Sequence, residues 1–293
     1  MARLLLPLCL LLALPLSASA LPEREAVPGG IALIKLAGDG DQTPQVSYRG
    51  HRAMVLRRDG HWVAVIGIPL STRPGRQRLT VRTADGDTHT QLFTVRKKKY
   101  GTEYITLKNK ELVTPNARDL RRIAREHRKI GAALTHWTPT PQPGIQFIPP
   151  LHGRISGAFG LRRYFNKKPR KPHSGLDIAA PEGTVIRAPA AGTVVEIGDY
   201  FFTGNTVFVD HGQGLVTMYC HMSHVDVKTG QHVHQGEALG KVGMTGRATG
   251  PHVHWGVSLN DTMVDPMLFL TKQERKQAFW YRRKRDNRQA AAK

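Results

Sequence analysis

The stretch "ATGPHVHWGV", Ala248–Val257, carries two histidines one residue apart in a segment typical of a β-strand. Because side chains alternate between the two faces of a strand, His252 and His254 are expected to point the same way and could hold a metal together. The earlier run "GQHVHQGE" carries His232 and His234 at the same spacing. The local pattern alone therefore does not distinguish the two pairs.

Two other histidine-bearing stretches lie upstream of this strand. The run "HSGLDIAAPEGT" begins at His173 and contains Asp177, and "LVTMYCHMS" contains His221. Zinc sites that catalyse hydrolysis use about three His or carboxylate ligands and leave a further position for water. His173, Asp177 and one later histidine would satisfy this requirement, and the remaining histidines could serve as base or electrostatic partner.

The segment of residues 152–269 resembles the lysostaphin/LytM-type zinc metallopeptidases, peptidase family M23. Four motifs carry the resemblance: "GAFGLR", "HSGLDIAAPEGTVIRAPAAGTV", "GNTVFVDHGQGLVTMYCHM" and "VGMTGRATGPHVHWGV". The resemblance implies a single zinc ion per chain, with the metal ligands His173, Asp177 and His254. It also implies two catalytic histidines, His221 and His252, and no ligand in the run "GQHVHQGE".

The chemistry that this resemblance implies is hydrolysis of a peptide bond by a zinc-activated water. Zinc lowers the pKa of such a water toward roughly 7, and a neutral imidazole can then take its proton. The sequence does not decide whether His221 or His252 is the principal base. On a regular strand Tyr219 would share the face of His221 and could donate a second hydrogen bond, whereas Cys220 would point away as a small buried thiol.

The charge of the chain indicates an anionic partner. Its 293 residues include 43 Lys and Arg against 22 Asp and Glu, a formal net charge of +21. Such a surface favours nucleic acid, an anionic membrane or an anionic cell-wall polymer. We expect no nucleic-acid partner, because no basic helix with interleaved aromatics, zinc-finger pattern or RNA-binding signature is present. Peptidoglycan and anionic cell-wall or envelope polymers remain as expected partners, and the oligomeric state stays open.

The first twenty residues, "MARLLLPLCLLLALPLSASA", have the pattern of a cleaved secretion signal. A basic start, a short apolar run and a small-residue exit predict cleavage after Ala20 and a periplasmic or secreted protein. No later stretch is long and apolar enough to predict a transmembrane segment. Cys9 would leave with the signal, so Cys220 would be alone and no intrachain disulfide is expected.

The predicted fold is mainly β, with a helix in the middle of the chain. Short strands bounded by Gly, Pro and Asp turns indicate a small N-terminal β-sandwich, to which we assign no family. We expect a signal peptide at 1–20, the N-terminal β domain at 21–98, a linker at 99–148 with a helix at about 115–136, an antiparallel M23 peptidase domain at 149–271 and a basic tail at 272–293. Thr114 is the expected helix cap, and His127 is expected on the packed apolar face.

Together these patterns predict an exported zinc metalloendopeptidase that cleaves cross-links or stem peptides of bacterial peptidoglycan. The D-alanyl–diaminopimelate cross-link is the first expected bond, and the pentaglycine bridge is the second. One alternative is an inactive or weakly active relative that binds and activates cell-wall amidases. Another is a factor that attacks the walls of competing bacteria. The complete set of five site positions favours an enzyme.

Overall fold

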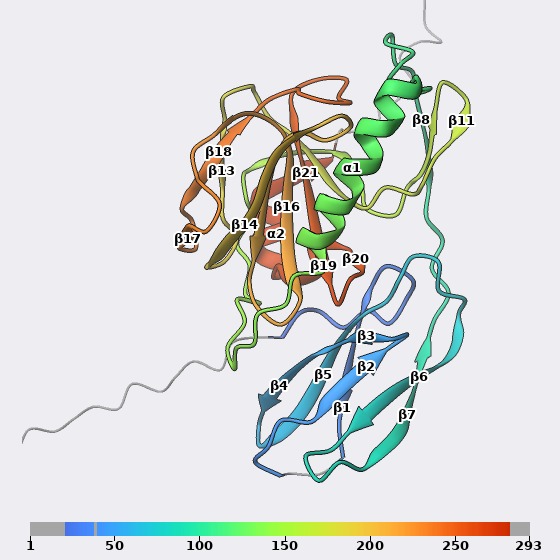
Figure 1. The fold of residues 1–293 in the computed structure, drawn as a ribbon, viewed down its shortest axis with the longest axis vertical. Coiled ribbons are helices and arrows are strands. Elements are labelled where there is room, and N and C mark those ends of the chain that lie inside the picture. The colour runs from blue at the N-terminus through green and yellow to red at the C-terminus, as the bar shows by residue number, and fades with distance from the viewer. Residues whose placement is uncertain (1–20, 38–39, 282–293) are drawn as a thin grey trace, which may run out of the picture.

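The computed structural model describes residues 21–37 and 40–281. The predicted secretion signal and the last residues of the predicted tail, 282–293, lie outside this range. The described chain forms a smaller N-terminal body of two sheets and a larger C-terminal body around an 11-stranded sheet (Figure 1). The mainly β fold class is confirmed. Within the described residues no helix has the length and apolar character that crossing a bilayer requires.

The N-terminal body is the predicted sandwich. Its two sheets have the strand orders β1-β5-β4 and β3-β2-β6-β7. In β6 the buried Leu79 and Val81 alternate with exposed neighbours, as a strand with one face in the core requires. The strands are β1 (Ile31–Lys35), β2 (Gln45–Tyr48), β3 (His51–Arg52), β4 (Met54–Arg58), β5 (His61–Gly67), β6 (Gly75–Arg82) and β7 (Thr88–Val95).

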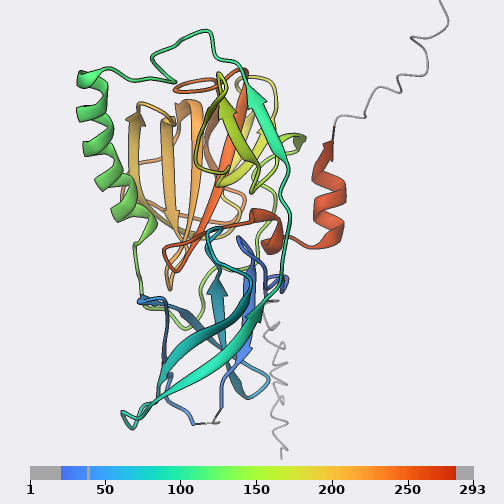
Figure 2. The ribbon, with the colours of Figure 1, turned by 90° about the vertical axis from the view of Figure 1, so that its right-hand side faces the viewer.

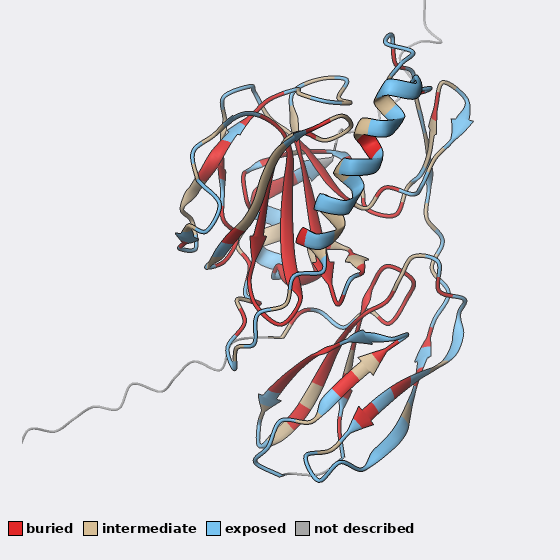
Figure 3. Cartoon of the chain, viewed as in Figure 1, coloured by how far each residue is buried: buried red, intermediate tan, exposed pale blue. Residues whose placement is uncertain are grey.

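The C-terminal body is built on the sheet with the order β17-β14-β15-β16-β19-β12-β9-β21. Its pairs are antiparallel except β21 with β9, and the central strands are buried along their length (Figure 3). The strands are β9 (Gly153–Gly157), β12 (Gly175–Ala179), β13 (Val185–Arg187), β14 (Gly192–Tyr200), β15 (Gly204–Asp210), β16 (Leu215–Val225), β17 (His232–Val233), β18 (Ala238–Val242), β19 (His252–Leu259), β20 (Met263–Val264) and β21 (Phe279–Tyr281).

A fourth, small sheet joins the middle of the chain to the start of the C-terminal body. Strand β8 (Thr102–Ile105) pairs in parallel with β10 (Arg162–Phe165), and β10 pairs with β11 (Lys168–Pro169). This sheet places Glu103 beside Arg163 in the β8–β10 register. It therefore links residues far apart in sequence next to the segment that carries His173.

Helix α1 (Ala117–Leu134) lies within the predicted range but begins later than expected. Its cap is Asn116, whose side-chain oxygen accepts a hydrogen bond from the Asp119 amide at 3.0 Å, so the predicted cap at Thr114 is wrong. The helix packs on β14 and β16. His127 is exposed rather than packed, because the buried stripe of this helix is narrow.

The last described elements lie on the other side of the large sheet. A 3-10 helix (Pro266–Phe269) leads into α2 (Lys272–Ala278), whose Thr271 and Glu274 form a capping box. Figure 2 shows α1 and α2 on opposite sides of the sheet. The first part of the predicted tail is thus a helix followed by the sheet strand β21.

One side of the sandwich packs into the hydrophobic core of the large sheet, and the sandwich also has a core of its own. Ile31, Met54, Leu56 and Val65 of the sandwich belong to the same buried cluster as the strands of the C-terminal sheet. The sequence between α1 and β9, expected as a linker, contributes the buried Ile145 and Phe147 to this cluster. The two bodies are therefore packed together and not joined only by a flexible segment.

Candidate metal centre

Strands β12 and β19 bring a carboxylate and an imidazole face to face. Asp177 and His254 are direct partners in the antiparallel register, and His173 lies four residues before Asp177. The His254 Nδ1 atom lies 2.8 Å from Asp177 Oδ1 and 2.9 Å from His173 Nε2, which is 3.0 Å from the same Oδ1. Ligand atoms on one tetrahedral zinc are about 3.3 Å apart, given bonds of about 2.0 Å. The three atoms thus converge on one point.

These three side chains suit zinc in chemistry as well as in spacing. Two imidazole nitrogens and a carboxylate oxygen are a donor set that zinc prefers. His173 Nδ1 donates to the carbonyl of Ala158 at 2.8 Å, which leaves the lone pair of Nε2 for a metal. A Cβ atom on Gly175 would lie 2.6 Å from His254 Nε2, so only glycine leaves room for this ring.

A salt bridge holds the other oxygen of the Asp177 carboxylate. Arg163 donates from Nη2 to Asp177 Oδ2 at 2.5 Å and from Nε to Glu103 Oε2 at 2.9 Å. Gly157 makes space for this pair, because a Cβ there would collide with both the carboxylate and the guanidinium. The sequence did not predict this contact, since Glu103 and Arg163 lie 60 positions apart and no local pattern joins them.

Burial and charge set the protonation of the candidate ligands. Burial alone would raise the pKa of Asp177, but the adjacent His173 and His254 outweigh it and hold that pKa well below its ordinary value. Burial lowers the pKa of His254 to about 4, although Asp177 opposes the shift. Asp177 is therefore a carboxylate and His254 a neutral imidazole near pH 7, which are the forms that bind metal.

Two further imidazoles lie beside this group. The ring centroids of His221 and His252 are 4.7 Å apart, and that of His221 is 6.4 Å from His254. His221 Nδ1 donates to the Thr245 carbonyl and His252 Nδ1 to the Gly250 carbonyl, each at 2.8 Å. In the neutral form of each ring, Nε2 is therefore the nitrogen with a free lone pair. Burial lowers the pKa of His221 to about 3, and electrostatic repulsion from His252 and His254 adds to this shift.

The strand that carries His221 is not regular. His221 has a left-handed backbone with φ of 64°, and its amide donates to the Thr203 carbonyl. Tyr219 consequently does not share a face with His221: it is fully buried and donates to the Thr217 hydroxyl at 2.8 Å. The hydrogen bond considered for Tyr219 at the site is wrong. Cys220 is a buried thiol, as predicted, but it pairs with His254 in the β16–β19 register.

The second His-x-His pair has different surroundings. The rings of His232 and His234 are exposed and 5.5 Å apart, at the edge strand β17. His232 Nδ1 donates to the Gly192 carbonyl, and the nearby Glu237 carboxylate accepts the His234 backbone amide. Within the described residues, His173, Asp177 and His254 form the one group of His, Cys, Asp or Glu side chains whose ligand atoms converge.

A groove of about 470 Å³ opens over the candidate ligands. One wall is α1, which contributes Leu120, Ile123 and the exposed His127. Arg247 lies in the groove with its guanidinium 4.2 Å from the Phe202 ring and 4.5 Å from the Phe165 ring. Burial lowers the pKa of Arg247 to about 10, so it remains a cation. An extended, negatively charged peptide would fit this groove, because the groove combines apolar side chains with a cation.

Comparison with known proteins identifies both bodies. The sequence pattern of Peptidase family M23 matches residues 171–266, and that of the Peptidase family M23 N-terminal domain matches residues 24–98. A crystal structure described as peptidase M23 from Pseudomonas aeruginosa is 47% identical with a TM-score of 0.71, covering 84% of this chain and 95% of its own. The N-terminal body, which received no family from the sequence, is included in this match.

Two curated relatives match the C-terminal body. The DD-carboxypeptidase/endopeptidase Mpg of Neisseria meningitidis is 39% identical over 124 residues, which are 42% of this chain and 29% of the relative. The peptidoglycan DD-endopeptidase ShyA of Vibrio cholerae is 39% identical over 115 residues, 39% of this chain and 27% of the relative. The chain thus spans less than a third of each relative. With both bodies matched in the Pseudomonas structure, the chain belongs to peptidase family M23.

Proposed function

We propose that this chain is a zinc endopeptidase that hydrolyses peptide bonds of bacterial peptidoglycan. The convergence of His173, Asp177 and His254, with two further imidazoles beside them, carries the proposal. The names of the Neisseria and Vibrio relatives support the substrate class. The bond that we expect to be cut first is the D-alanyl–diaminopimelate cross-link.

The proposed ligands of zinc are His173, Asp177 and His254. Zinc at this point would act as a Lewis acid toward the peptide carbonyl and would activate water. The Arg163 guanidinium occupies Asp177 Oδ2 and so directs Oδ1 toward the two imidazole nitrogens. Hydrogen bonds to the atoms of a ligand side chain that do not bind the metal fix the orientation of that side chain. The matching hydrogen bond from His173 to Ala158 fixes the tautomer of that ligand.

His221 and His252 are the proposed proton carriers. Both direct Nδ1–H to a backbone carbonyl, so Nε2 is the nitrogen that can accept a proton from water or later return it to the leaving amine. The lowered pKa of His221 makes this side chain a weak base. His221 is therefore better suited to stay neutral and to form a hydrogen bond with the reacting atoms. We therefore propose His252 as the principal base.

The proposal includes export. The pattern at residues 1–20 is that of a secretion signal, and peptidoglycan lies outside the cytoplasmic membrane, so a periplasmic or secreted location is expected. The formal charge of +21 would favour binding to anionic wall or envelope polymers.

The test combines metal content with product analysis. Purified protein should carry about one zinc per chain, and chelation should stop hydrolysis that added zinc restores. Purified cell walls should lose cross-linked dimers without gaining reducing sugar ends. Protein that folds and binds zinc but leaves every muropeptide dimer intact would favour the amidase-regulator alternative. New reducing ends with unchanged dimers would contradict peptide-bond hydrolysis.

A further inference from the structure

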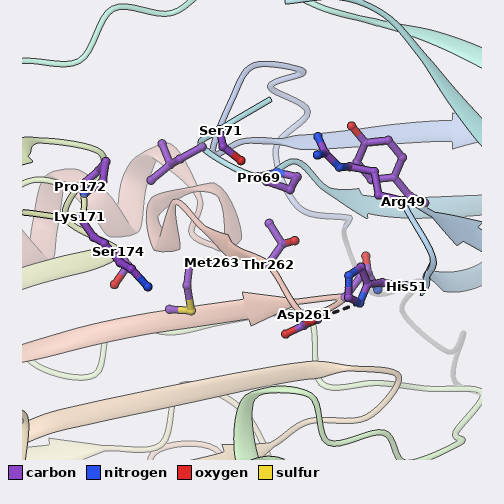
Figure 4. Close-up of a pocket in the computed structure, with 13 residues that line it drawn as sticks. Arg49, His51, Pro69, Ser71, Lys171, Pro172, Ser174, Asp261, Thr262 and Met263 are labelled. Atoms are coloured by element: carbon purple, nitrogen blue, oxygen red, sulfur yellow. Dashed lines mark ion pairs between the residues drawn. The ribbon is translucent and has the colours of Figure 1, made fainter. Parts of the chain in front are cut away.

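A second cavity lies between the sandwich and the peptidase sheet. Its volume is about 840 Å³, within the range of ordinary ligand pockets. Figure 4 shows Lys171, Pro172 and Ser174 at one end, Arg49 and His51 at the other, and Thr262 and Met263 between them. The first three of these residues also line the groove over the metal centre. The two cavities therefore share the segment that carries His173.

The walls of this cavity are held in fixed relation to each other. His51 of the sandwich forms an ion pair with Asp261 of the peptidase body, with Nδ1 3.1 Å from Oδ2. The Asn260 side-chain oxygen accepts a hydrogen bond from the Gly67 amide at 3.3 Å, also across the boundary. A Cβ on Gly67 would lie 2.5 Å from the Leu259 carbonyl, so the two backbones are in close contact. The cavity is thus preformed.

Arg49 occupies an unusual backbone position at this cavity. It is the first residue of a two-residue hairpin turn between β2 and β3, with φ of 53° at Arg49 and 85° at Gly50. Such turns favour Asn, Asp or Gly, because other side chains resist positive φ. In the three comparable turns of the described chain the first residue is Asp59, Asn166 or Asn260. Arg at a position that Asn, Asp or Gly would occupy with less backbone strain suggests that the Arg49 side chain has a function.

The polar groups of the cavity favour an anion. Arg49 and Lys171 pair with no carboxylate among the described residues, whereas the acid of the cavity, Asp261, is already paired with His51. Thr72 accepts one Arg49 N–H at 3.4 Å, which leaves the other guanidinium donors available. The Asn260 amide nitrogen, behind the cavity wall, is buried and has no hydrogen-bond partner. Guanidinium donors match a carboxylate in geometry and charge.

We propose that this cavity is a substrate subsite, in which Arg49 of the sandwich binds a free carboxylate of a peptidoglycan stem peptide. The inference rests on the proposed function, because stem peptides carry such carboxylates and the cavity adjoins the metal groove. Lys171 lies between the two cavities and would draw the same chain toward His173. The N-terminal domain would then contribute directly to substrate recognition.

The structure offers a substitution that removes the cation and keeps the turn. Asn is favoured at positive φ, so Arg49→Asn should fold with an unchanged or higher thermal midpoint. Zinc-loaded Arg49→Asn should show a KM about tenfold higher for a soluble muropeptide dimer, the effect of one lost charged hydrogen bond. Its kcat should stay within about twofold and its zinc content should not change. Arg49→Lys should recover part of the affinity. Asp59→Asn, at the same position of another turn, is the matched control and should behave as the parent.

Two further measurements separate this subsite from the proposed function. A dimer whose free carboxylates are converted to amides should have a raised KM with the parent and little further change with Arg49→Asn. Calorimetric binding of the uncross-linked stem tripeptide to the zinc-loaded protein needs no hydrolysis and should weaken about tenfold in Arg49→Asn. If the parent binds the tripeptide but cleaves nothing, the enzymatic function fails and the subsite stands. A parent-like KM and parent-like tripeptide binding in Arg49→Asn would overturn the subsite.

Discussion

His252 and His254 differ from His232 and His234 in their neighbours and not in their spacing. His254 lies 2.8 Å from the Asp177 carboxylate, and the ring centroid of His252 lies 4.7 Å from that of His221. The other pair is exposed beside an edge strand. A metal site requires groups from other strands, and the fold brings such groups to His254 but not to the exposed pair.

Substitution of the two pairs tests this difference. His254→Ala should lose zinc and hydrolysis together, whereas His252→Ala should keep most of its zinc and lose at least about 100-fold in rate. The His232→Ala/His234→Ala double variant is the matched control and should keep both. Metal content and turnover of one muropeptide dimer measure these effects, after circular dichroism has established folding. A folded but zinc-free double variant, beside a zinc-loaded His254→Ala, would reverse the assignment.

His211 provides a pH test that is independent of catalysis. Its Nδ1 donates to the Ala191 carbonyl and its Nε2 accepts from the Thr217 hydroxyl, each at 2.8 Å, and burial lowers its pKa from 6.5 to about 4. The unfolded chain therefore binds more protons between these values, and stability must fall as the pH drops through this window. The shift corresponds to about 3 kcal/mol at the acid end.

The measurement is the urea midpoint of zinc-free protein between pH 7.5 and 4. The parent should lose stability as the pH falls below about 6.5, and His211→Gln should lose less over the same range. Burial lowers the pKa of His221 and His254 as well, so the substitution should remove only part of the dependence. An equal slope in the two proteins would show that His211 does not carry the effect.

The residues that the sequence could identify are those in short linear motifs. His173, Asp177 and His254 could be predicted as candidate ligands because their residue types suit a metal and their motifs resemble the family. The Arg163 contact with Asp177 could not be predicted, because no local sequence pattern brings these two side chains together. The placement of Tyr219 failed for a related reason, since alternation assumes a regular strand and His221 interrupts it.

At the scale of elements, a partly buried carboxylate, that of Glu126, links α1 to the sheet in addition to the apolar contacts of the helix. Glu126 accepts a hydrogen bond from the Phe201 amide at 2.9 Å and another from Arg122 Nε at 2.5 Å. Arg122 also donates to the Asp199 carbonyl. These bonds connect the helix to the turn after β14, where Phe202 lines the groove. The helix thus positions one wall of the groove.

Removal of this carboxylate should loosen the helix from the sheet. Glu126→Ala would leave the Phe201 amide without an acceptor and should cost about 1–3 kcal/mol in the free energy of unfolding. Glu126→Gln keeps one acceptor oxygen and should cost less. Urea unfolding of the three proteins measures the difference, and KM should rise in the Ala variant. An Ala variant as stable as the parent would mean that water replaces the contact.

Periodicity predicted α1 well and its beginning less well. Apolar residues at helical spacing indicated the helix, but Thr114, Pro115 and Asn116 all suit a helix start. The choice between them depends on which side chain reaches the amide of the first turn, and Asn116 does so. The apolar spacing predicts a packed His127, but this side chain is exposed and lines the groove.

At the scale of the whole molecule, a shared apolar cluster joins the sandwich to the peptidase body. Met54, Leu56 and Val65 are almost fully buried in the same cluster as Trp255 and Leu259 of the central strand β19. Separation of the bodies would expose these side chains to water, at a cost of roughly 25 cal/mol for each Å² of apolar surface. The sequence predicts a sandwich and a peptidase domain but not the contact between their apolar faces. The alternation of apolar and polar residues in each body could be explained by a separate core in each.

We therefore expect thermal unfolding in a single transition, and zinc provides the way to detect it. A metal that binds only the native peptidase body raises the unfolding temperature of that body and of any part of the chain that unfolds together with it. If the two bodies unfold together, added zinc should also raise the temperature at which the sandwich unfolds. Hydrogen exchange of the β6 and β7 amides measures unfolding of the sandwich.

A substitution in the sandwich tests the same coupling from the other side. Leu79→Ala, inside the sandwich's own core, should lower the temperature at which zinc is released, by the several degrees that a loss of about 2–5 kcal/mol implies. Leu56→Ala, at the shared core, should do the same. Two calorimetric transitions, with Leu79→Ala moving only one and zinc only the other, would mean that the bodies fold separately and that the contact between them adds little.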